Sequence, residues 1–118
     1  MTKSDGIPAV PTGTKAGGRR LWRAVLSDYD LDEHELALLR EAVRTVDLCD
    51  DLDTLVKREG VVIDSPQGRK AHPAAVEARQ QRIALARLLA ALRVPLGDQA
   101  DTRPQRRTGV RRPYAVGS

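Results

Sequence analysis

The sequence contains a single cysteine, Cys49, no phenylalanine and only 3% aromatic residues. One thiol excludes an intrachain disulfide framework and a zinc site built from several thiolates, and low cysteine usage is typical of a reducing cytoplasm. No apolar run reaches the roughly 18 residues that a membrane-spanning helix needs. The N-terminus also lacks the apolar core of a secretion signal. We therefore expect a cytoplasmic protein that makes no contact with a membrane.

Catalytic motifs are missing as well. The chain has no G-x-x-x-x-G-K-[ST] phosphate-binding loop. The only two histidines, His34 and His72, lack metal-ligand spacing to each other or to Cys49. A cluster of aspartates in the middle of the chain is interpreted as a solvated or subunit-facing acidic stripe, because its members point in different directions around a helix; they are Asp47, Asp50, Asp51 and Asp53. We expect no enzymatic activity, no cofactor and no metal.

What the chain does have is an uneven distribution of charge. Residues 1–20 carry four basic and one acidic side chain, for a net charge of +3. Residues 21–64 carry five basic and twelve acidic side chains (−7), and residues 65–118 carry eleven basic and three acidic ones (+8), which together give the overall +4. An acidic first half and a basic second half suit a protein that meets nucleic acid with one part and protein with another. A solvated surface with arginine-rich tails is the alternative.

Helical periodicity dominates the middle of the chain. Apolar residues around Trp22 predict a short amphipathic helix from about Arg19 to Ser27, with Trp22 anchoring it on longer helices. A long helix follows. Asp32 is its predicted N-cap, and Gly60 is the residue expected just past its end.

The long helix carries more apolar surface than one short partner can cover. One stripe steps by 4, 3, 4, 3, 4 from Leu38 to Val56, and a second stripe from Leu36 to Val46 lies beside it. Burial against both its own chain and a second subunit would explain this width. The predicted oligomer interface consists of Leu36, Leu38, Leu39, Val43, Cys49, Leu52 and Val56. The alternative is that the other two helices cover the surface within a monomer.

The long helix is followed by a turn signal and a last helix. "VVIDSPQGRK" predicts a short β-hairpin or an ordered loop, since its residues are β-branched and then turn-forming. His72 should be extended because Pro73 follows it, and Pro73 suits the first turn of a helix that runs to about Leu92. Pro95 then prevents its continuation.

These elements predict a mainly all-α fold. A short N-terminal helix is followed by a long central helix, a short hairpin or loop and a C-terminal helix, and the two longer helices form an antiparallel helical hairpin. We expect residues 1–18 to be a disordered arm, residues 19–95 a helical oligomerisation domain, and residues 96–118 a disordered basic tail. The size of the ordered part is marginal for independent stability, which favours an oligomer.

Charge placement alone suggests the residues that contact double-stranded DNA. They lie at the start of the first helix, at the turn, on the last helix and in the tail: Arg19, Arg20, Arg69, Lys70, Arg79, Arg82, Arg93, Arg106, Arg107, Arg111 and Arg112. Arg79 and Arg82 have an alternative role. They could instead form salt bridges to the acidic helix, for example to Glu41 or Asp47 of the same or a neighbouring chain.

The order and spacing of several elements resemble the small subunit of phage terminases, a family of tailed phages and prophages. The match extends over roughly residues 19–95. The two terminal segments of the chain match only as low-complexity flanks and add little to the resemblance. The matching residues are Leu21-Trp22, Tyr29, Leu31, Glu35, Leu38-Leu39, Asp47, Gly60, His72-Pro73, Glu77, Arg79, Leu85, Arg87, Leu88-Leu89 and Leu92. Each is a capped helix, a turn or a leucine pair, so the resemblance lies in their combination.

This resemblance implies that residues 19–95 form a DNA-packaging domain with a role in viral genome packaging. Small subunits of this kind assemble into homo-oligomeric rings, recognise viral DNA in the cytoplasm of the bacterial host and deliver it to the large terminase subunit, which holds the ATPase and the nuclease. The missing phosphate loop agrees with that division of labour. A small helical DNA-binding regulator or a helical adaptor protein is the alternative. A helix–turn–helix reader is disfavoured. Its two helices are joined by a turn of three or four residues, whereas the connection in this chain, from about Gly60 to His72, is longer.

Overall fold

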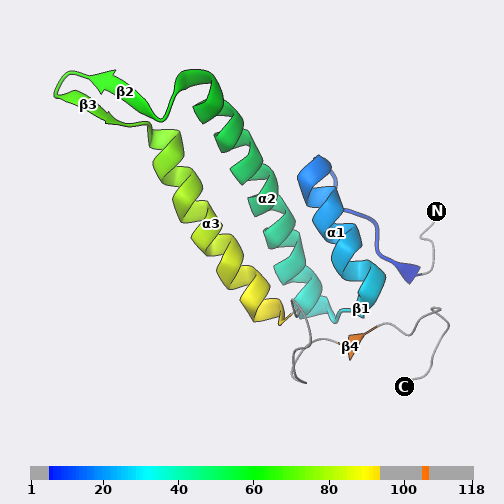
Figure 1. Cartoon of the computed structure of the whole chain (residues 1–118). Coiled ribbons are helices and arrows are strands. Elements are labelled where there is room, and N and C mark those ends of the chain that lie inside the picture. Colours follow the sequence, from blue (N-terminus) through cyan, green and yellow to red (C-terminus); the bar gives the residue numbers. More distant parts are fainter. Residues whose placement is uncertain (1–5, 94–104, 107–118) are drawn as a thin grey trace.

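A computed structural model describes residues 6–93 and 105–106 of the chain. Within these residues it is mainly helical, as predicted, and Figure 1 shows the long helix α2 between the shorter helices α1 and α3. The elements in chain order are α1 (Ala16–Asp28), β1 (Tyr29–Asp30), α2 (Glu33–Glu59), β2 (Val62–Ser65), β3 (Gly68–Ala71), α3 (Pro73–Leu92) and β4 (Gln105–Arg106). The predicted antiparallel helical hairpin is formed by α2 and α3, and the β2–β3 hairpin projects from the end where they are joined.

Helix α2 begins and ends where its sequence signals predicted. Asp32 precedes its first residue, and the Asp32 backbone N–H donates to Oε1 of Glu35 at 2.7 Å. At the other end Lys57 and Arg58 occupy the last turn, where cations favour the negative end of the helix dipole. Gly60 follows with a φ of 94°, a backbone conformation that a residue with a side chain rarely adopts.

Helix α1 starts earlier than predicted, at Ala16 rather than Arg19. Residues 6–15 precede it along the core rather than forming part of a free arm: Ile7 and Val10 pack on the core, and Nε1 of Trp22 donates to the backbone oxygen of Pro8 at 2.9 Å. The boundary at residue 18 is therefore wrong. The composition of this segment indicated flexibility, but its apolar side chains and the Trp22 contact hold it.

Two glycines bring α1 unusually close to α2. Gly17 and Gly18 are both buried. A Cβ atom on Gly18 would lie only 2.9 Å from the backbone oxygen of Val43 and 2.9 Å from Oδ2 of Asp47. Such distances are below normal contact, so glycine is required for the observed spacing of the two helices.

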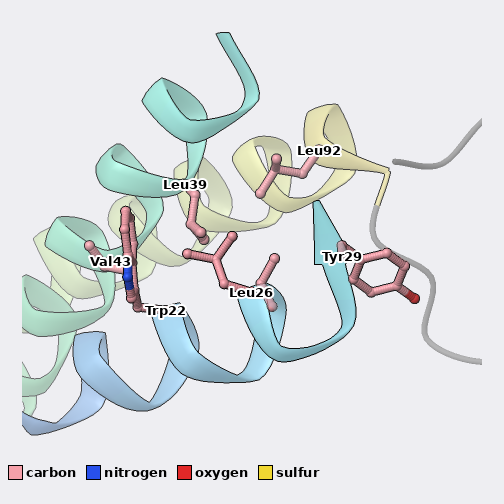
Figure 2. Close-up of a cluster of buried hydrophobic side chains, with 7 residues drawn as sticks. Trp22, Leu26, Tyr29, Leu39, Val43 and Leu92 are labelled. Atoms are coloured by element: carbon pink, nitrogen blue, oxygen red, sulfur yellow. The ribbon is translucent and has the colours of Figure 1, made fainter. Parts of the chain in front are cut away.

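The hydrophobic core lies where α1 crosses α2 near the end of α3 (Figure 2). Its buried members are Trp22, Val25, Leu26, Tyr29, Leu39, Val43 and Leu92. Trp22 thus anchors α1 on the longer helices, as predicted. Ala74 and Ala78, in the first half of α3, are also buried, as is Ala42 of α2.

The core changes the predicted oligomer interface. Leu39 and Val43 are fully buried within the chain, and Leu36 and Leu38 pack against the same core. Cys49 is also buried, as a small apolar residue on α2. Leu39, Val43 and Cys49 are therefore covered by the chain itself, as the monomer alternative proposed, whereas Leu36 and Leu38 are half-buried. Only two predicted interface residues stay half-buried outside the core, Leu52 and Val56.

The junction of α2, the hairpin and α3 is organised by His72. Its extended backbone precedes Pro73 as predicted, and its N–H donates to the backbone oxygen of Val61 at 2.7 Å. His72 is only 7% exposed. Nδ1 accepts from the Ala74 N–H at 2.9 Å and so caps α3, while Nε2 lies 2.7 Å from Oε1 of Glu59. Because Nδ1 accepts, the ring proton belongs on Nε2, which donates to the Glu59 carboxylate.

The predicted turn is a two-stranded antiparallel hairpin. Val62 pairs with Ala71 and Ser65 with Gly68, so Pro66 and Gln67 form the turn between the strands. Of the predicted tail, only Gln105 and Arg106 lie in the described part of the chain, where they pair antiparallel with β1. Arg107, Arg111 and Arg112 lie outside the described residues.

Candidate nucleic-acid interface

The acidic residues of α2 determine which basic residues are available to a partner. Asp47 accepts from two backbone N–H groups at the start of α1, with Oδ2 2.7 Å from the Lys15 nitrogen and Oδ1 2.8 Å from the Gly18 nitrogen. It therefore acts as a cap supplied by a neighbouring helix, since the first N–H groups of a helix have no partner within it. Nothing in the local sequence of α1 signals this contact.

Two further aspartates form ion pairs within the chain. Oδ2 of Asp51 lies 2.7 Å from Nζ of Lys15, and this hydrogen bond and its charge raise the pKa of Lys15. Asp53 binds Arg82 of α3 at 2.5 Å, and the same two causes raise the pKa of the Arg82 guanidinium. The aspartate stripe thus joins α2 to α1 on one side and to α3 on the other. The stripe was expected to face solvent or a second subunit; Asp51 and Asp53 also form contacts within the chain, while their side chains remain 55% and 41% exposed.

Arg82 takes the alternative role considered for it. It pairs with the acidic helix, although its partner is Asp53 rather than Glu41 or Asp47. The pair lies at the rim of a groove of about 360 Å³ between α2 and α3, whose apolar lining includes Cys49, Leu85 and Leu89. Burial raises the pKa of the Cys49 thiol. Arg82 is therefore a weaker candidate for DNA contact than its position in the sequence suggested.

Helix α1 presents arginines on the face opposite the core. Arg19, Arg20 and Arg23 are all exposed, and at 100° per residue they fall within an arc of about 100°. The Arg19 guanidinium donates to the Thr14 backbone oxygen. Arg20 and Arg23 have no ion-pair partner among residues 6–93. Arg23 was not among the predicted DNA contacts, although its spacing from Arg19 and Arg20 was a usable signal.

Helix α3 presents a second basic face. Arg79 and Arg87 are exposed and have no acidic partner in the described part of the chain. Among the described residues Arg79 therefore forms no salt bridge to the acidic helix of its own chain, and the alternative pairing with a neighbouring chain stays a prediction. Two apolar side chains, Val76 and Ile83, share this face and are 40% and 43% exposed. Arg93 follows α3 in a left-handed conformation with a φ of 60° and is exposed.

The β2–β3 hairpin carries the third basic group. Arg69 pairs with Asp64 at 3.3 Å, but both side chains are largely exposed, so the pair contributes little and competes weakly with a phosphate. Lys70 is exposed opposite Ile63. The structure thus distributes the predicted DNA residues over separate elements and does not converge them on one cleft. For Arg106 only the backbone pairing with β1 is described.

A possible metal-binding group occurs at the start of α2. Ligand atoms of Asp32, His34 and Glu35 lie within 4.8 Å of one another. Glu35 already accepts from the Asp32 N–H, and the three side chains are exposed or half-exposed. Their arrangement follows from helix capping, so it gives no reason to assign a metal.

Among the residues described, no helix is both long and apolar enough to cross a membrane. Comparison with known proteins gives no family: no protein-family model, no curated protein and no solved structure matches this chain.

Proposed function

We propose that the chain is the small subunit of a phage terminase. It is a non-catalytic homo-oligomer, a ring of subunits in the cytoplasm of the bacterial host, that binds double-stranded viral DNA and delivers it to the large ATPase–nuclease subunit. The support for this family is the resemblance in the order and spacing of residues 19–95. The support for DNA binding is independent of that resemblance and comes from the placement of charge.

The observation that supports DNA binding is that some charged side chains are paired within the chain and others are not. The acids of α2 are largely used within the chain, on Lys15 and Arg82 and as a cap for α1. Four exposed arginines lack such partners among the described residues: Arg20 and Arg23 on α1, and Arg79 and Arg87 on α3. Guanidinium groups that are exposed and unpaired suit phosphate oxygens, which accept up to two parallel hydrogen bonds from one arginine.

Such binding is directed at phosphates and depends steeply on salt. Each phosphate neutralised on duplex DNA contributes about −0.9 to the slope of log affinity against log salt concentration. Contacts to phosphates position a protein on DNA and carry no sequence information directly, so we expect weak sequence preference from this helix. Repetition of the face in an oligomer adds weak contacts through avidity.

The test is a salt titration of duplex binding by fluorescence anisotropy. The double variant Arg20→Gln/Arg23→Gln should flatten the slope by about 1.8 for each subunit that contacts DNA, since two phosphate contacts are lost. Arg82→Gln is the matched control, because it removes an arginine already paired with Asp53 and should leave the slope unchanged. Equal slopes for all three proteins, or no binding by the unaltered chain, would refute the DNA interface.

The family assignment has its own test. A neighbouring gene for a large protein with a P-loop ATPase and a nuclease domain supports the terminase role. A regulator would show strong base preference, whereas a helical adaptor would bind no DNA. The 13-residue segment from Gly60 to His72 contains a β-hairpin, which disfavours a helix–turn–helix regulator built from α2 and α3.

A further inference from the structure

Two helix faces point away from the core and combine apolar with charged side chains. The α3 outer face consists of Val76, Arg79 and Ile83, all exposed. The α2 outer face consists of Leu48, Asp51 and Leu55, of which Leu48 is 41% exposed and Leu55 half-buried. None of these six residues belongs to the core or packs directly against it.

The two faces match in spacing. In each, a charged residue follows the first apolar residue by three positions, and the second apolar residue follows by seven. At 100° and 1.5 Å per residue, each triplet falls within an arc of about 60° and places its apolar residues about 10.5 Å apart along the helix. The charged residue lies three positions after the first apolar residue and four positions before the second. Its place between them is therefore nearly the same in a parallel and in an antiparallel contact, so the charged residues meet in both.

The two faces are also opposite in charge. Arg79 has no ion-pair partner in the described part of the chain. Asp51 uses Oδ2 for Lys15, but its side chain remains 55% exposed and Oδ1 is left for a second cation. An arginine between two apolar residues on one face thus complements an aspartate between two apolar residues on the other.

We infer that the α3 outer face of one chain docks on the α2 outer face of a second copy. The complementary partner for each face lies on this same chain, which favours a second copy over an unrelated protein. The contact joins two different faces, so every subunit retains one unused face of each kind and the contact repeats into a ring or a filament. This inference rests on the proposed homo-oligomer and identifies its contact surfaces.

Charge exchange between two variants tests the contact without DNA. Arg79→Asp and Asp51→Lys should each weaken self-association of the full chain at least about tenfold, because like charges then meet at the contact. In an equimolar mixture, the new acid on one variant meets the new base on the other, and the unchanged faces also meet. Sedimentation velocity should therefore show monomers for each variant alone and wild-type-sized oligomers for the mixture.

Three controls isolate the contact. Lys15→Ala removes the same intrachain ion pair as Asp51→Lys and should leave the oligomer intact. Arg23→Asp makes the same charge reversal on α1 and should also leave it intact. Leu48→Asn disturbs the α2 outer face without touching Lys15 and should weaken association. Circular dichroism confirms that each variant is folded.

The inference is overturned if the unaltered chain is monomeric at micromolar concentration, if the variants associate as it does, or if the mixture fails to reassemble. These outcomes are distinct from failure of DNA binding. A mixture that reassembles but does not bind DNA would support this contact and refute the DNA interface. DNA binding by a chain that never assembles would refute this contact and support the DNA interface.

Discussion

The two halves of α2 carry similar apolar patterns in different surroundings. In residues 33–46, Leu39 and Val43 are completely buried between α1 and α3. In residues 47–59, Leu48 is 41% exposed and Leu55 is half-buried. The difference comes from the side of the helix: at 100° per residue Leu48 lies about 180° around α2 from Leu39, whereas α1 packs on the side of Leu39 and Val43 (Figure 1). Apolar residues of one long helix can therefore serve the core on one side and a partner on the other.

The boundary between the halves is where α1 begins. Asp47 caps α1 and Asp51 holds Lys15, so both contacts lie at this transition. Beyond it, charged and apolar residues of α2 face either α3 or solvent. This arrangement explains how one acidic segment can hold the fold together and still offer an exposed carboxylate.

Truncating one leucine in each half is the strongest test of the comparison. Leu39→Ala should lower the free energy of unfolding by about 2–5 kcal/mol, because it leaves a cavity in the core. Leu48→Ala should change it by less than about 0.5 kcal/mol, as for other exposed sites. Chemical denaturation at a concentration where the chain is monomeric measures both. Equal losses would mean that the two halves are equally buried in solution.

Adding a methyl group at the α1–α2 contact is the next largest test. Gly18→Ala places Cβ against the backbone oxygen of Val43, which cannot rotate away, and should cost about 1–3 kcal/mol of stability. Gly17→Ala instead meets mainly the movable side chain of Asp50, and gains up to about 1 kcal/mol of helix propensity. Thermal unfolding should rank Gly18→Ala well below Gly17→Ala. The opposite order would show that α1 does not lie this close to α2.

Removing the cap at the boundary should have a smaller effect. Asp47→Ala leaves the N–H groups of Lys15 and Gly18 without their acceptor and should cost about 0.5–2 kcal/mol, as loss of an N-cap does. Hydrogen exchange should show the faster exchange in α1 and not in α3. Asp50→Ala, on the same helix, is the control. Uniform acceleration in all three helices would contradict a local capping role.

The smallest expected effect is a pH dependence at the far end of α2. The hydrogen bond from His72 lowers the pKa of Glu59 below its ordinary value of 4.5. The folded state therefore binds this proton less readily than the unfolded chain, so the contact stabilises the fold above that value and loses its effect as pH falls through the lowered pKa. Glu59→Gln should be slightly less stable than the unaltered chain at pH 6, and the difference should shrink as the pH falls through the lowered pKa of Glu59. A pH-independent difference would exclude a charge effect.

Local signals in the sequence predicted the helices and the hairpin well. Asp32, Gly60 and Pro73 each define a helix end through the conformation of one or two residues. The turn between β2 and β3 is similarly encoded by Pro66 and its neighbours. These features depend on interactions within a few positions of the chain, which is why one sequence is sufficient to predict them.

Contacts between distant residues were not predictable in the same way. The periodicity of α2 showed which residues are apolar, but whether α1, α3 or another subunit covers Leu39 depends on where α1 crosses. The pairing of Arg82 with Asp53 likewise depends on the register of α3 on α2, and an expected partner such as Asp47 was taken by the start of α1. The exposed arginine face of α1 could have been found from the spacing of its three arginines alone.

The burial of Cys49 has a practical consequence. It is the only cysteine of the chain, and it lines the groove between α2 and α3 with little exposed surface. Separation of those two helices should expose it further to a thiol reagent, and in the folded chain burial raises the pKa of the thiol, which slows its reaction. The rate at which Cys49 is modified is thus a measure of opening of the helical hairpin. It can be measured in the unaltered protein, without introducing a label.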